Sequence, residues 1–172
     1  QVTSDYLMGV SGGAFKLFWH PDGSAANCAL PVYGGEPAGR IFWALGREFA
    51  SVHLWDETVR GAMAEGARRL IVESIDTGRP VVAYGVVGPP EACLLTGYER
   101  GGEVLLGWSY FQESHDAPFR AESWSSDLHG LLLFRERRQA PDERAVLAST
   151  LDLALRLARE PAFVGAPAGP NQ

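Results

Sequence analysis

The chain has 172 residues, of which 46% are apolar and 21% charged, and its formal net charge is −6. This composition fits one folded domain and excludes a disordered chain. The negative charge excludes sequence-independent binding of nucleic acid, which needs a basic surface, and no run approaches the ~18 apolar residues of a membrane span.

The N-terminus and the cysteines indicate a reducing compartment. The first ten residues lack a basic segment followed by an apolar core, so we expect no signal peptide. Cys28 and Cys93 are too few for a disulfide framework, and their spacing fits no zinc motif. We therefore expect a cytoplasmic protein with no metal site, no cofactor and no membrane partner.

The first third of the chain shows little regular periodicity. Residues 6–8 are apolar but belong to no visible helical pattern, and the sequence Ser-Gly-Gly at residues 11–13 predicts a tight turn. Alternating apolar residues predict a strand over residues 14–19. After a loop-like stretch, residues 36–49 have the apolar spacing of a helix.

A long helix is predicted next. A short strand over residues 51–55 leads to Asp56, whose carboxylate can accept the free N–H groups of a first helical turn. Apolar residues at helical spacing continue to about Thr77. Gly78 is a candidate for the helix end, and Pro80 prevents the helix from continuing.

Three strands then follow in succession, over residues 80–87, 91–98 and 103–108. Val, Leu, Tyr and Trp dominate them, and Gly/Pro clusters separate them. A fourth strand is predicted at residues 131–134, after an irregular aromatic-rich stretch.

The C-terminal part predicts a helix over residues 141–159 and a flexible tail over residues 165–172. The expected buried side of this helix consists of its apolar residues: Val146, Leu147, Leu151, Ala154, Leu155 and Ala158.

Helices come first in this order and a block of antiparallel strands comes later. We therefore predict an α+β fold with an antiparallel sheet core packed on helices, in a single domain over residues 1–164.

Two phrases in the strand block resemble papain-like folds of the bacteriocin-processing peptidase type. These are GRPVV at residues 78–82 and LLTGY at residues 94–98. Further phrases are similar to bacterial relatives of the butirosin-type acyltransferase N-terminal domain: YLMGVSG at 6–12, AF at 14–15, GPPE at 88–91 and GWSYFQ at 107–112.

The resemblance implies a papain-like fold. This chain, however, departs from the pattern of papain-type catalysis in two ways. The position of the family's catalytic histidine falls on Glu91, and the Asn or Asp that orients it falls near Trp108 or Ser109. In the relatives, a helix carrying the nucleophilic cysteine precedes the YLMG phrase, and we expect this chain to lack that helix. A carboxylate beside a thiolate would raise the pKa of the thiol, so papain-type catalysis by this chain alone is not expected.

The candidate ligand-binding residues follow from the same positions. They are Ser11, Glu91, Trp108, Ser109 and Tyr110. Glu91 could bind a cation or a ligand amine, or act as a general base, against the alternative of a solvated carboxylate at a strand end. The sequence GVSGG at residues 9–13 matches the hydrolase elbow G-x-S-x-G, but a predicted strand follows it where the elbow needs a helix. A glycine turn lining the pocket is therefore the preferred interpretation.

Two functional hypotheses stay open. The first is a catalytically defective papain-like domain that binds a small molecule or a peptide in the former active-site cleft. The second is a cysteine-dependent peptidase or acyltransferase whose nucleophile lies outside this chain or is Cys28. Besides the small molecule or peptide, the expected partner is a further segment of the same protein or a second copy of this chain in a homo-oligomer.

Overall fold

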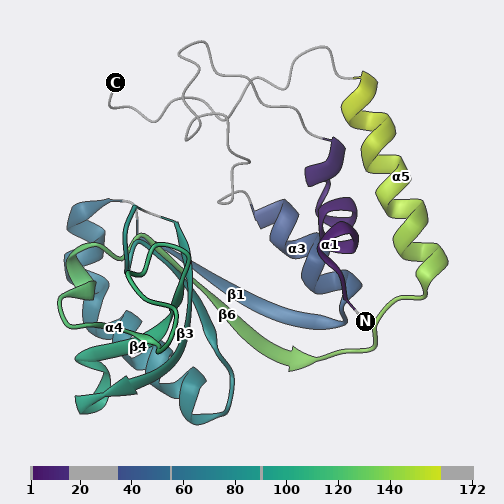
Figure 1. Cartoon of the computed structure of the whole chain (residues 1–172). Helices are drawn as coiled ribbons and strands as arrows, with labels where there is room; N and C mark the ends of the chain where they lie inside the picture. The colour runs from purple at the N-terminus through teal and green to yellow at the C-terminus, as the bar shows by residue number, and fades with distance from the viewer. Residues whose placement is uncertain (1, 16–34, 55, 90, 160–172) are drawn as a thin grey trace, which may run out of the picture. The chain divides into compact units, whose positions relative to one another are not determined.

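The computed structural model describes residues 2–15, 35–54, 56–89 and 91–159. Within them the chain has a mixed α and β fold, with four α-helices and a six-stranded antiparallel sheet (Figure 1). The contacts divide the chain into two compact units, residues 1–47 with 137–172, and residues 48–136. Each unit is described by itself, and a single domain over residues 1–164 stays a prediction.

The second unit contains nearly all of the sheet, whose strand order is β1-β6-β2-β3-β4-β5. The strands predicted over residues 80–87, 91–98, 103–108 and 131–134 are present as β2, β3, β4 and β6. Strand β5 was not predicted, because three residues are too few for a visible alternation. The bounds are β1 Arg47–His53, β2 Val81–Tyr84, β3 Ala92–Glu99, β4 Val104–Ser109, β5 Phe119–Ala121 and β6 Gly130–Arg137.

Strand β2 is four residues long and ends at Tyr84, earlier than the predicted residue 87. Gly85 follows it with a φ of 85°, and a Cβ at this position would lie only 2.2 Å from the carbonyl oxygen of Asp127. Only glycine combines this left-handed backbone with such a close approach. The strand therefore turns away from the sheet at Gly85.

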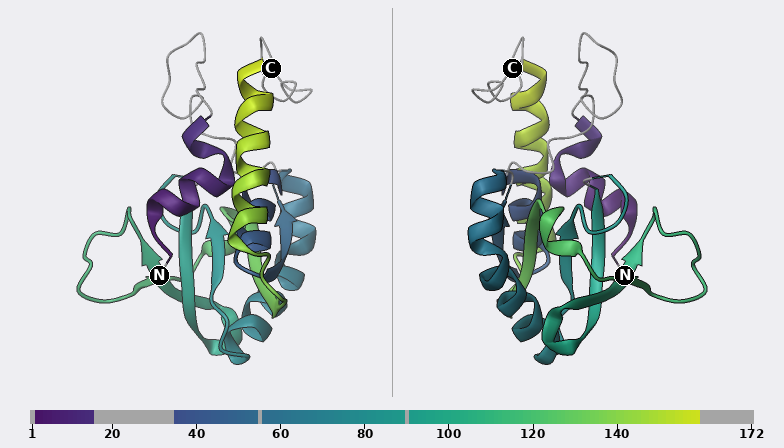
Figure 2. Two further views of the ribbon diagram at one scale, coloured as in Figure 1. Left: turned by 90° about the vertical axis from the view of Figure 1, so that its right-hand side faces the viewer. Right: turned by 90° about the vertical axis from the view of Figure 1, so that its left-hand side faces the viewer.

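Helix α4 (Glu57–Asp76) confirms the predicted long helix. The carboxylate of Asp56 accepts hydrogen bonds from the backbone N–H groups of Thr58 and Val59, at 2.8 and 3.1 Å. The chain leaves the helix at Gly78, which has a φ of 73°. Ala67 and Ile71 of α4 join the main core, which also contains side chains from the four strands β2, β3, β4 and β6, from the 3-10 helix η3 (Trp124–Ser126) and from the loop after it. Figure 2 shows α4, in blue, beside the strands of the sheet.

Among its described residues the first unit contains three α-helices, and the first of them was not predicted. Helix α1 (Ser4–Ser11) begins at Thr3, whose hydroxyl accepts a hydrogen bond from the N–H of Tyr6 at 3.2 Å. The strand expected over residues 14–19 is wrong at its start, because Gly13–Phe15 form the 3-10 helix η1. The rest of that range lies outside the described residues.

Helix α3 (Gly35–Ala44) is shorter than the predicted helix over residues 36–49. Gly46 ends it with a φ of 60°, and β1 begins directly afterwards at Arg47 instead of at Ser51. A Cβ on Gly46 would lie 2.7 Å from the backbone nitrogen of Ala140, so the close approach of a neighbouring segment decides this boundary.

Helix α5 (Glu143–Arg159) confirms the predicted C-terminal helix, and the carboxylate of Asp142 accepts a hydrogen bond from the N–H of Ala145. Its buried residues are Val146, Thr150 and Leu153. The expectation that Leu147, Leu151 and Leu155 are buried is wrong, because each is more than half exposed. The tail at residues 165–172 lies outside the described residues.

In the described part of the chain, no helix combines the length and the apolar character needed to cross a membrane.

Candidate functional site

An apolar pocket lies at one end of the central strands of the second unit. Its volume is about 430 Å³. Three of the five ligand-binding residues predicted from the sequence lie in its wall, together with residues of β2, β3 and the loop after β4. The lining residues are Val82, Ala92, Cys93, Leu94, Trp108, Ser109, Tyr110 and His115.

The pairing of the strands explains why these side chains meet. Leu94 of β3 lies opposite Val82 of β2 on one side and Trp108 of β4 on the other. Directly opposed residues of antiparallel strands share a face, so the three side chains form one row across the sheet. Leu94 and Trp108 are 38% and 39% exposed. Their neighbours Cys93 and Leu95, and Ser109 opposite Cys93, alternate to the other face, where α4 closes the core. The side chain of Cys93 is therefore directed away from the pocket that this residue borders.

The loop after β4 is fixed by Gln112, a buried residue that sequence reasoning missed. Its side-chain oxygen accepts a hydrogen bond from the N–H of Ser109 at 2.8 Å. Its side-chain nitrogen donates to the carbonyl oxygens of Ser114 and Ala117. This one side chain therefore holds the two ends of the loop that carries Tyr110 and His115. The sequence signal for this role is a single glutamine at the end of the aromatic phrase GWSYFQ at residues 107–112.

The polar groups of the pocket are few. The hydroxyl of Ser109, which is only 6% exposed, accepts a hydrogen bond from the N–H of Phe111 at 3.1 Å. The imidazole of His115 is exposed and offers one donor and one acceptor when neutral. Tyr110 is 86% exposed, and its ring meets that of Phe111 edge to face at 5.4 Å. A ligand here meets apolar surface and a small number of hydrogen-bonding groups.

Glu91 lies one residue before β3, adjacent in the chain to Ala92 of the pocket wall. Its side chain is exposed, and its carbonyl oxygen accepts a hydrogen bond from the N–H of Gly85. The turn before it approaches the aromatic loop, because a Cβ on Gly88 would lie 2.7 Å from Cβ of Phe111. Glu91 is thus next to the pocket wall in the chain without lining the pocket itself, and its binding role stays a prediction.

Ser11 belongs to the first unit, where its side chain closes the end of α1. It is 7% exposed, donates to the carbonyl oxygen of Met8 and accepts from the N–H of Gly13, both at 3.1 Å. The predicted tight turn is present, with a φ of 85° at Gly12. A helix precedes Ser11 where the hydrolase elbow needs a strand. Its part in ligand binding stays a prediction, and Cys28 lies outside the described residues.

Cys93 is a core residue and not a nucleophile. It is 4% exposed, and burial raises the pKa of its thiol from 9.0 to about 12, against a smaller opposing effect of backbone hydrogen bonds at Ala83 and Val86. The thiolate is the reactive form of cysteine, so Cys93 stays unreactive near neutral pH.

The burial of Cys93 predicts a loss of stability in alkali. Between pH 9 and 12 the unfolded chain releases the thiol proton while the folded chain keeps it, so a rising pH favours unfolding. We expect the free energy of unfolding of the wild type to fall relative to that of Cys93→Ala, by at most about 1.4 kcal/mol per pH unit. Urea titrations at pH 8 to 10.5 measure this difference. Parallel profiles of the two proteins would contradict the assignment.

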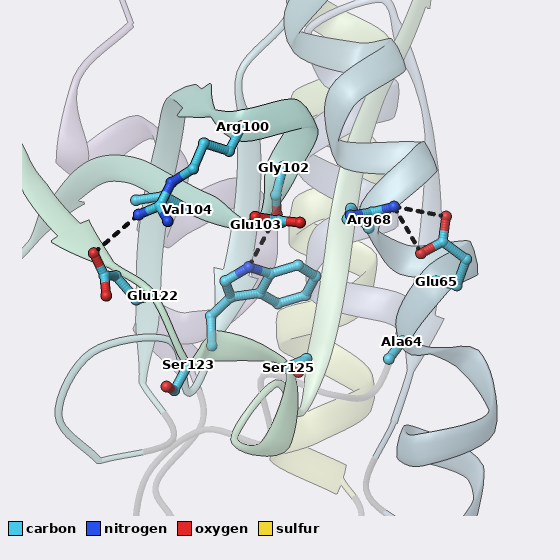
Figure 3. Close-up of a pocket in the computed structure, with 11 residues that line it drawn as sticks. Ala64, Glu65, Arg68, Arg100, Gly102, Glu103, Val104, Glu122, Ser123 and Ser125 are labelled. Carbon is cyan, nitrogen blue, oxygen red and sulfur yellow. Dashed lines mark hydrogen bonds and ion pairs between the residues drawn. The ribbon is translucent and has the colours of Figure 1, made fainter.

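A second pocket of about 490 Å³ lies between α4, the turn after β3 and residues 122–125. Figure 3 shows Arg68 paired with Glu65 on one side and Arg100 paired with Glu122 on the other, at 3.1 and 3.2 Å. Trp124 also lines this pocket, and its indole N–H donates to the carbonyl oxygen of Gly102 at 3.1 Å. Both arginines of the pocket thus have carboxylate partners, and Glu103 adds a further carboxylate to its wall.

No group of three or more His, Cys, Asp or Glu side chains that could hold a metal ion occurs among the described residues. Comparisons with protein-family models, with curated proteins and with solved structures found no match.

Proposed function

We propose that this chain is a catalytically defective papain-like domain that binds a small molecule or a peptide in the apolar pocket of the second unit. The observation that carries the proposal is the exposed row of Leu94 and Trp108 beside Tyr110, at the end of the sheet where Glu91 leads into β3. Ligand pockets typically have volumes of about 300–1,000 Å³, mostly apolar walls and a few polar groups, and this pocket fits that description.

The strand pairing supports the papain-like interpretation. In that fold the catalytic histidine begins one strand and its orienting residue ends the neighbouring antiparallel strand. Here β3 begins just after Glu91 and pairs with the end of β4, with Cys93 opposite Ser109. A carboxylate and a hydroxyl thus stand where the family places its histidine and amide. The exposed carboxylate of Glu91 can bind a ligand amine, but neither group can activate a thiol.

The ligand class follows from the wall of the pocket. Trp108 and Tyr110 offer aromatic faces for stacking, and Leu94 offers an aliphatic surface. The exposed imidazole of His115 supplies a donor and an acceptor at the rim. We infer a ligand with an aromatic or branched apolar group, and Glu91 adds a preference for a positively charged amine.

The experiment uses two small peptide-like probes, N-acetyl-L-phenylalaninamide and L-phenylalaninamide, followed by backbone amide NMR of the full chain. We expect shifts at the residues of the pocket wall. Trp108→Ala should weaken both probes about tenfold through lost stacking and apolar contact. Trp43→Ala is the matched control, because Trp43 is exposed to a similar extent but lies in α3. Equal weakening by both variants would refute the site.

The role of Glu91 is tested by the difference between the two probes. The charged amine of L-phenylalaninamide should bind more tightly than the acetylated form, and Glu91→Gln should remove this advantage while leaving the acetylated probe unaffected. If the advantage persists in Glu91→Gln, Glu91 does not bind the ligand.

A further inference from the structure

Helix α5 carries apolar side chains on two faces. One face is buried and contains Val146 and Leu153. The other consists of Leu147, Leu151 and Leu155, which are 56%, 52% and 54% exposed. Residues four positions apart are neighbours on a helix surface, so these three form one continuous row, which we call the leucine ridge. Figure 1 labels the helix that carries it.

The two ends of α5 carry opposite charge. Asp142 and Glu143 lie at its start, followed by Arg144, and Arg156 and Arg159 lie in its last turn, where Arg156 already pairs with Asp152 at 3.3 Å. This arrangement already complements the helix dipole. An antiparallel neighbour of the same sequence would bring the acidic end of each helix to the basic end of the other.

We propose that the leucine ridge is the surface through which two copies of this chain associate, with their α5 helices antiparallel and Leu151 at the twofold axis. Leu147 of each copy then meets the partner's Leu155. A twofold interface requires a surface that is complementary to itself, and a row with equal spacing on either side of Leu151 meets this requirement. A second copy is therefore the occupant that the pattern favours.

The crossing geometry extends this match to the charges. Rows of four-residue spacing on two helices interdigitate at a crossing angle of about −50°, and each row then lies along the other. Glu143 and Arg159 continue the leucine ridge at its two ends, at equal distances from Leu151. Glu143 of each copy is thus brought to the partner's Arg159, and the symmetry forms this pair twice. Ala148 and Ala158, both exposed, are small enough to let the helices approach.

Sedimentation equilibrium of the full chain over about a hundredfold range of concentration tests the proposal. We expect a monomer–dimer equilibrium. Leu151→Glu should abolish it, because two carboxylates would face each other at the axis. Met63→Glu is the matched control: Met63 is an exposed apolar residue of α4, and its replacement should leave the equilibrium unchanged. Circular dichroism verifies that both variants are folded.

A charge-swap cycle distinguishes this arrangement from other ways of covering the ridge. Glu143→Arg and Arg159→Glu should each weaken the dimer about tenfold, since both copies of the pair become repulsive. The double variant should recover most of the wild-type affinity. A chain that is monomeric at every concentration, a dimer that survives Leu151→Glu, or a double variant no tighter than the two single ones would overturn the proposal.

Discussion

Gly107→Ala is expected to lower the free energy of unfolding by about 3 kcal/mol, because it overpacks the centre of the sheet. A Cβ at Gly107 would lie 2.3 Å from the carbonyl oxygen of Leu94 and 2.9 Å from the ring of Phe119. Backbone cannot give way as a flexible side chain can, so β3 and β4 must separate. Glycine inside a strand often marks such a close approach of another backbone.

The neighbouring strand supplies a matched control for this substitution. A Cβ on Gly97 of β3 would meet only the side chain of Leu106, at an ordinary contact distance of 3.5 Å. Gly97→Ala should therefore change the stability by less than about 1 kcal/mol. Urea denaturation followed by circular dichroism measures both variants. Similar losses for the two would show that strand propensity, and not the contact with Leu94, determines the effect.

The consequence of Gly107→Ala extends to the proposed ligand site. Gly107 precedes Trp108, and the Leu94 backbone that the new methyl group meets belongs to the residue paired with Trp108. Separation of β3 and β4 therefore pulls apart the row that lines the pocket. We expect the amide shifts induced by the phenylalanine probes to disappear in this variant and to persist in Gly97→Ala.

The sequence predicted the elements whose boundaries are encoded locally. Helix α4 has a capping carboxylate at Asp56 and a glycine with positive φ at its end, and both signals are visible without tertiary information. Helix α1 has a capping threonine too, but its eight residues are too few to establish a helical period. The end of α3 depends on the approach of Ala140 to Gly46, which no local pattern records.

The faces of α5 show a second limit. Apolar residues occur on two sides of this helix, and periodicity identifies a stripe without saying what covers it. The leucine ridge has the better spacing, yet the side chains packed in the first unit's core are on the other face, where Val146 joins Val10 and Ala44. Which stripe is buried is decided by tertiary packing.

The candidate pocket was predictable only in part, because the folding of a loop also brings residues to it. Trp108, Ser109 and Tyr110 were predicted because they stand at a strand end, where pockets form. His115 joins them only because Gln112 folds the loop back through three hydrogen bonds to backbone groups. Such bonds between residues two to five positions apart leave no periodic signal in a sequence.

Trp124→Ala is expected to lower the free energy of unfolding by about 4 kcal/mol. Trp124 lies in the 3-10 helix η3, is 5% exposed and belongs to the main core with Leu105 and Leu128. Its indole N–H donates to the carbonyl oxygen of Gly102 at 3.1 Å. The side chain thus fills the core and also fixes the turn between β3 and β4, so its removal leaves a large cavity and loses a buried hydrogen bond.

Trp124→Phe separates these two contributions. Phenylalanine keeps most of the apolar volume but leaves the buried carbonyl of Gly102 without the indole donor, so a loss of about 1–2 kcal/mol is expected. The turn itself should loosen in both variants, because the indole N–H that bonds the carbonyl oxygen of Gly102 is lost. Gly102 has a φ of 92° and lies against the side chains of Arg68 and Val72 of α4. Hydrogen exchange at residues 100–104 measures this loosening. If Trp124→Phe were as stable as the wild type, with unchanged exchange at the turn, the stability would come from apolar packing alone and the hydrogen bond to Gly102 would contribute nothing.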